Sequence, residues 1–160
     1  MLDQSSIPEL KTLAAALVQT LPEDHSPGDP AYLSRAALDI CLAANWTSDN
    51  LLGTAIDCAR RYWVGQASEE AREAVRSQVV ERAEALRKQG QQFSPEWCKY
   101  ALVMWSLDIR TPSTNHEADY LLDFSLKAGV SLKTICEALM AQVPGLSEAL
   151  AAGGDGSKTA

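Results

Sequence analysis

The stretch SEEAREAVRSQVVERAEALRKQG, residues 68–90, decides the fold class, because it carries the marks of one long helix. Ser68 is a favoured N-cap, and acidic residues fill the turn that follows it. Arg87 and Lys88 occupy the last turn, so the order of charges complements the helix dipole, and Gly90 can end the helix. An apolar stripe runs along one face: Ala71, Ala74, Val75, Val79, Ala83 and Leu86.

The same punctuation recurs along the rest of the chain and predicts about seven helices. The expected N-caps of the other helices are Ser6, Asp29, Ser48, Ser94 and Ser131, with a sixth helix over residues 115–128. The expected stops are the proline-rich loop 22–30, Gly65, the turn at 111–113, Gly129 and Pro144-Gly145, with a short last turn after them. Since no period-two pattern is long enough for a strand, we predict an all-α fold, bundle-like or orthogonal. We expect a single domain over residues 1–151 and a disordered tail over 152–160.

Composition and charge bound the class of partner. The chain has 160 residues, 46% of them hydrophobic, and a formal net charge of −7. An acidic balance opposes binding to nucleic acid or to anionic membranes, and it favours either simple solubility or a basic protein partner. The N-terminus lacks the pattern of a signal peptide, and no apolar run reaches the roughly 20 residues of a membrane span. We therefore expect a cytoplasmic protein.

The motifs of catalysis and metal binding are incomplete. His116-Glu117-Ala118-Asp119-Tyr120 begins like the zinc-protease motif HExxH, but Tyr120 stands where the second histidine is required. The other histidine, His25, lies in the proline-rich loop. The cysteines form no CxxC pair and fit buried thiols inside helices: Cys41, Cys58, Cys98 and Cys136. We expect no catalytic set, no metal and no cofactor.

The segment 105–123 is the first candidate for a partner-binding surface, because it interleaves aromatic and acidic residues and has one cation, Arg110. Aromatic residues beside charge are typical of protein interfaces. The alternative is that Trp105 belongs to the core and the acids form a solvated face. The candidate residues are Trp105, Asp108, Glu117, Asp119, Tyr120 and Asp123.

Two smaller clusters complete the candidates. Trp46 and Asp49, at the corner between two predicted helices, form the second candidate for partner binding. Arg60-Arg61 beside Tyr62-Trp63 resembles a set that stacks on bases. The alternative for that set is that Arg61 pairs with Asp57 one helical turn earlier and Trp63 lies in the core.

A family resemblance adds a functional expectation. Residues 55–65, AIDCARRYWVG, end an alanine-rich helix in an aromatic residue and a glycine, and residues 69–74, EEAREA, open an alanine- and arginine-rich helix. Over about residues 35–90, this pattern resembles the all-helical immunity proteins of bacterial polymorphic toxin systems. The resemblance implies a small, acidic, cytoplasmic protein that binds a cognate toxin and occludes its active site. The alternatives are a helical adaptor or chaperone-like protein, and an enzyme whose site follows no sequence motif.

Overall fold

The computed structural model describes residues 7–23, 31–46, 49–108 and 113–159, with side chains described up to residue 153. These residues form eight helices and no strand. The helices are α1 (Leu10–Thr20), α2 (Tyr32–Ala44), α3 (Asn50–Trp63), α4 (Glu69–Lys88), α5 (Pro95–Leu107), α6 (Asn115–Lys127), α7 (Leu132–Gln142) and α8 (Leu146–Thr159). The all-α prediction is confirmed.

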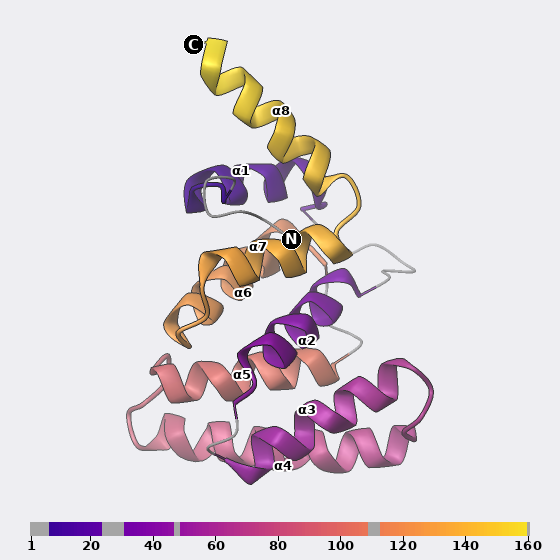
Figure 1. The fold of residues 1–160 in the computed structure, drawn as a ribbon. Coiled ribbons are helices and arrows are strands. Elements are labelled where there is room, and N and C mark those ends of the chain that lie inside the picture. The colour runs from indigo at the N-terminus through magenta and orange to yellow at the C-terminus, as the bar shows by residue number, and fades with distance from the viewer. Residues whose placement is uncertain (1–6, 24–30, 47–48, 109–112, 160) are drawn as a thin grey trace.

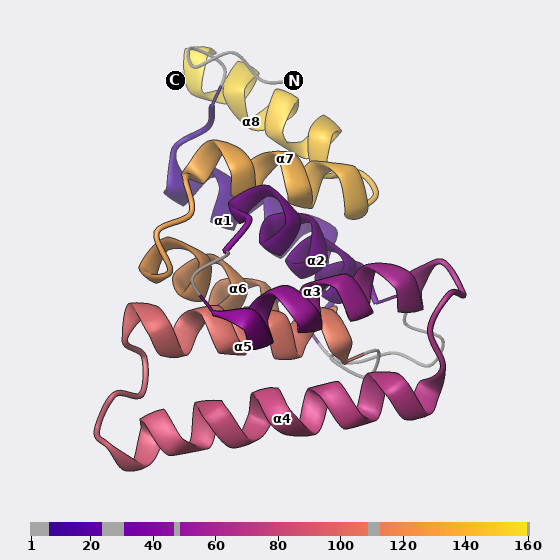
Figure 2. The ribbon, with the colours of Figure 1, turned by 60° about the horizontal axis from the view of Figure 1, so that its bottom comes forward.

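Six of the helices form two layers of three. In Figure 1, α2, α3 and α7 lie towards the viewer, and α4, α5 and α6 lie behind them. Helix α5 is central to the second layer and packs against α2, α3, α4 and α6. Figure 2 shows α4 along one edge of the molecule, and α1 and α8 pack together at the opposite end. Among the described residues, no helix covers the side of the α4–α5–α6 layer that faces away from α2, α3 and α7.

The local signals of the sequence account for most helix ends. The side chains of Ser68, Ser94 and Ser131 accept hydrogen bonds from the backbone N–H groups of Ala71, Trp97 and Thr134. These bonds satisfy donors that have no partner within the first turn of a helix, which confirms the three predicted caps. A left-handed glycine follows each of α3, α4 and α6, at Gly65, Gly90 and Gly129.

Three of the predicted N-caps differ from those in the structure. Asp49, and not Ser48, caps α3, since its Oδ1 atom accepts a hydrogen bond from the Leu51 N–H at 2.8 Å. Serine and aspartate are both favoured N-caps, so the sequence pattern does not distinguish Ser48 from Asp49. The caps expected at Ser6 and Asp29 are also wrong, because the N-cap positions of α1 and α2 are Glu9 and Ala31. Ser6, Asp29 and Ser48 themselves lie outside the described residues.

The C-terminal end of the chain differs from the sequence expectation. A short last turn after Pro144-Gly145 was predicted, but the structure has a helix there, α8, which makes the count eight among the described residues. The first part of α8 carries Leu146, Ala149 and Leu150, which pack against the core. This anchored start offsets the low helix propensity of the glycines that follow, because extending an existing helix costs less than nucleating one.

One hydrophobic core joins all eight helices. Its largest fully buried side chains come mainly from α1, α2, α5, α6 and α7: Leu13, Leu17, Leu33, Ile40, Tyr100, Leu102, Leu107, Leu121, Ile135 and Leu139. Cys41, Cys58, Cys98 and Cys136 are buried free thiols, as the sequence predicted. Among the described residues, no helix combines the length and the apolar character that crossing a bilayer demands.

A polar cluster ties the start of α3 to the layer behind it. The Asp49 carboxylate caps α3, accepts a hydrogen bond from the Tyr100 hydroxyl and lies 3.6 Å from the Arg82 guanidinium. The Tyr100 hydrogen bond is the main reason that the pKa of Asp49 is lowered. Burial, followed by the Asp49 contact, raises the pKa of Tyr100 to about 12.

This cluster predicts a pH dependence of stability. Asp49→Asn keeps a capping oxygen but removes the charge, and it should lower the free energy of unfolding by about 1–2 kcal/mol near neutral pH. Because the folded-state pKa is depressed, the carboxylate stabilises the fold above its unfolded pKa of about 3.9 and stops doing so as the pH falls through the folded value. Urea unfolding should therefore separate wild type from variant near pH 7 and bring them together in acid. The exposed Asp119→Asn change is the control and should leave the stability unchanged at both pH values.

Candidate functional site

The uncovered side of the α4–α5–α6 layer contains a groove with a volume of about 340 Å³. We call it the aromatic groove. Its lining comes only from these three helices and from the residue directly after α5: Arg76, Trp97, Ala101, Met104, Trp105, Asp108, Glu117, Tyr120 and Phe124. The groove is therefore built from one layer of the fold, and α5 supplies four of these nine residues.

Four aromatic rings line the groove. On α5, Trp97 and Trp105 lie two helical turns apart, and Ala101 lies between them on the same face. From α6, the Phe124 ring contacts the rings of both tryptophans, with centroids 5.3 and 6.3 Å away. Tyr120 stacks beside Phe124 at 6.0 Å and is 55% exposed. The small Ala101 side chain leaves the space between the two indoles.

Carboxylates lie at the rim on one side of these rings. Asp108, after the end of α5, pairs with Arg76 of α4 across 3.4 Å. Glu117, in the first turn of α6, is half-buried, and within the described residues no cation pairs with its carboxylate. The groove thus combines aromatic surface with the paired carboxylate of Asp108 and with that of Glu117, which has no cation beside it in the described part of the chain.

The structure brings together four of the six residues proposed for the first surface. Trp105, Asp108, Glu117 and Tyr120 all line the groove. Trp105 is 7% exposed, so its ring belongs to the core and to the wall of the groove at once. The other two lie outside the groove on the exposed side of α6, where Asp123 pairs with Lys127 at 2.9 Å and Asp119 faces solvent.

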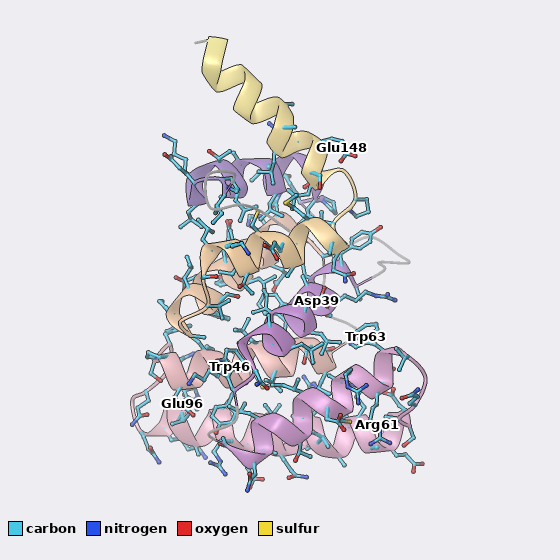
Figure 3. All side chains as sticks on the ribbon, in the orientation of Figure 1. Asp39, Trp46, Arg61, Trp63, Glu96 and Glu148 are labelled. Carbon is cyan, nitrogen blue, oxygen red and sulfur yellow. The ribbon has the colours of Figure 1, made fainter. Side chains whose placement is uncertain are left out.

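The second proposed surface lies in a different place. Trp46 and Asp49 line a more polar hollow of about 470 Å³ between α2 and α3, in the other layer. Asp49 is committed to the contacts with Tyr100 and Arg82, and the Lys99 ammonium lies 5.9 Å from the centre of the Trp46 ring. Figure 3 shows Trp46 and Trp63 at opposite ends of the α2–α3 region.

The remaining candidates have structural partners. Asp57 pairs with Arg60 at 2.8 Å and with Arg61 at 3.9 Å, which includes the predicted pair. Trp63 packs against the core and donates a hydrogen bond from Nε1 to the Ser106 carbonyl. His116 is exposed in the first turn of α6, and His25 lies outside the described residues. Within the described ranges, no three histidine, cysteine or acidic side chains gather into a metal-binding group.

Sequence reasoning missed about half of the groove. It did not single out Trp97, Ala101 and Met104, which share a helical face with Trp105. It did not single out Phe124, although Tyr120 and Phe124 are four residues apart and therefore share a face. The spacing Trp97, Ala101, Trp105 was the available signal, since two large rings on either side of a small residue make a hollow.

Comparisons with protein-family models, with curated proteins and with solved structures give no match for this chain.

Proposed function

We propose that this protein works by binding another protein, and that the aromatic groove receives an exposed basic and apolar segment of that partner. The observation that carries this proposal is the convergence of four aromatic rings and of Glu117, a carboxylate with no cation beside it among the described residues, in one groove. Aromatic side chains supply much of the energy of protein interfaces, and rim charges steer the approach of a partner of opposite sign. The net charge of −7 adds to this attraction for a basic partner.

The specific form that we propose is a cognate inhibitor of a bacterial toxin. The support for this form is the resemblance of residues 55–74 to immunity proteins, together with the acidic character of the groove. Toxins that act on nucleic acids or nucleotides need basic active sites, because their substrates carry phosphate. An acidic and aromatic surface that occupies such a site would exclude the substrate.

The test is co-expression with toxin domains encoded beside the gene of this protein. Wild type should restore growth of the host, and Glu117→Lys should remove the protection, because the lysine places a cation where the partner brings its own. Asp119→Lys makes the same charge change two residues away but outside the groove, and it should protect as well as wild type does. Both variants should melt within a few degrees of wild type, since reversing a first-turn charge costs roughly 0.3–1 kcal/mol.

The outcomes separate the alternatives. Equal protection by both variants would place the interface elsewhere. Binding of a partner without protection from it would favour the adaptor function over the inhibitor. Failure of every adjacent toxin domain to bind wild type would contradict the inhibitor proposal.

A further inference from the structure

We infer that the aromatic groove holds one arginine side chain of the partner, with its guanidinium against the aromatic rings that line the groove and paired with Glu117. This inference rests on the proposed function, since it names the group of the partner protein that the groove recognises.

The first observation concerns the faces of the rings. Elsewhere in this protein, four aromatic rings already have a cation above them: Arg35 on Trp63, Arg72 on Tyr62, Lys99 on Trp46 and Lys127 on Phe93, at 4.9 to 5.9 Å from the ring centres. Among the described residues, none of the four rings of the groove has one. Indole has the aromatic face that attracts cations most strongly, and the groove presents two indoles.

The second observation concerns charge. Asp108 is paired with Arg76, which leaves Glu117 as the carboxylate of the lining that has no cation beside it in the described part of the chain. A half-buried carboxylate gains more from a cation than a fully exposed one does, because water screens the attraction less. The site therefore lacks one positive charge.

The third observation is size. A volume of about 340 Å³ is at the lower end of the range for ligand sites, roughly 300–1,000 Å³, so the groove suits one side chain. Arginine fits better than lysine, because its guanidinium is planar, stacks on aromatic rings, forms bidentate pairs with carboxylates and is more weakly hydrated than an ammonium group.

The experiment uses two short peptides, acetyl-Gly-Arg-Gly-amide and the same peptide with citrulline, which is the neutral isostere of arginine. The indole N–H signals of the four tryptophans are followed by NMR on the ¹⁵N-labelled full chain. The arginine peptide should shift the Trp97 and Trp105 signals with a dissociation constant in the millimolar range, while Trp46 and Trp63 serve as internal controls and stay in place. Citrulline should bind at least about tenfold more weakly, and Glu117→Gln should reduce the arginine effect by a similar factor.

The result that overturns the inference is an equal response to both peptides, or no shift of Trp97 and Trp105 with either. If the full partner protein still shifts these two signals, the proposed binding through the groove stands, but the assignment of an arginine side chain to the groove is wrong. If the partner leaves both signals in place, the groove is not the interface and the proposed site fails as well.

Discussion

The Arg72→Ala variant is expected to lose about 3 kcal/mol of unfolding free energy, a large share of the roughly 5–15 kcal/mol of a typical domain. Arg72 is buried on α4, and its Nη1 atom donates to the Leu107 carbonyl in the last turn of α5 at 2.5 Å. The same guanidinium binds the carboxylates of Glu69 and Glu73 and lies over the Tyr62 ring. One side chain therefore joins the end of α3, the start of α4 and the end of α5.

The size of this effect follows from the groups that Arg72 leaves behind. The Leu107 carbonyl is among the last in α5 and has no partner within the helix, so removing its donor leaves a buried acceptor unsatisfied. The packing of the arginine stem is lost as well. The melting temperature of a chain of this length should fall by about 6–12 °C. Arg72→Lys should recover only part of the loss, because an ammonium group cannot reproduce the planar fork.

Arg87→Ala is the matched control for this prediction. Arg87 lies on the same helix and also pairs with a glutamate one turn earlier, Glu84, but both side chains are about half exposed. Exposed pairs of this kind contribute little to stability, so the melting curve should stay in place. Equal effects of the two substitutions would contradict the structural role assigned to Arg72.

Helix ends were predictable from the sequence because their causes are local. A serine cap and a left-handed glycine act within one helical turn, and the structure has them at Ser68, Ser94, Ser131, Gly65, Gly90 and Gly129. The choice of Asp49 over Ser48 was not predictable, because it depends on Tyr100 and Arg82, which are distant in sequence. The length of α8 depends in the same way on its packing against α1.

The groove was predictable only in part, for a physical reason. Asp108, Glu117 and Tyr120 follow Trp105 closely along the chain, so their shared pattern was visible in the sequence. Periodicity shows which face of α5 is apolar, but not whether another helix covers that face. Trp97 and Ala101 were therefore not singled out from the sequence, and Arg76 reaches the groove only because α4 packs against α5.

The aromatic groove is the central claim, and filling it without removing any contact group tests it most directly. Ala101→Leu places an isobutyl group between Trp97 and Trp105, where the partner side chain should lie. Gly53→Leu is the matched control, because it places the same group in the hollow between α2 and α3. A Cβ atom added at Gly53 has no heavy atom within 4 Å, apart from the neighbouring backbone of its own helix.

The measurement is the affinity of each variant for the toxin domain that the survival assay identifies, by titration calorimetry, with melting curves to confirm that both variants fold. Loss of a central contact of about 2 kcal/mol corresponds to roughly a 30-fold change in the dissociation constant. Ala101→Leu should weaken binding by at least about that factor, and Gly53→Leu should bind within about twofold of wild type. Unchanged affinity of a folded Ala101→Leu, with weakened binding of Gly53→Leu, would move the interface to the hollow beside Trp46 and Asp49 and contradict the account.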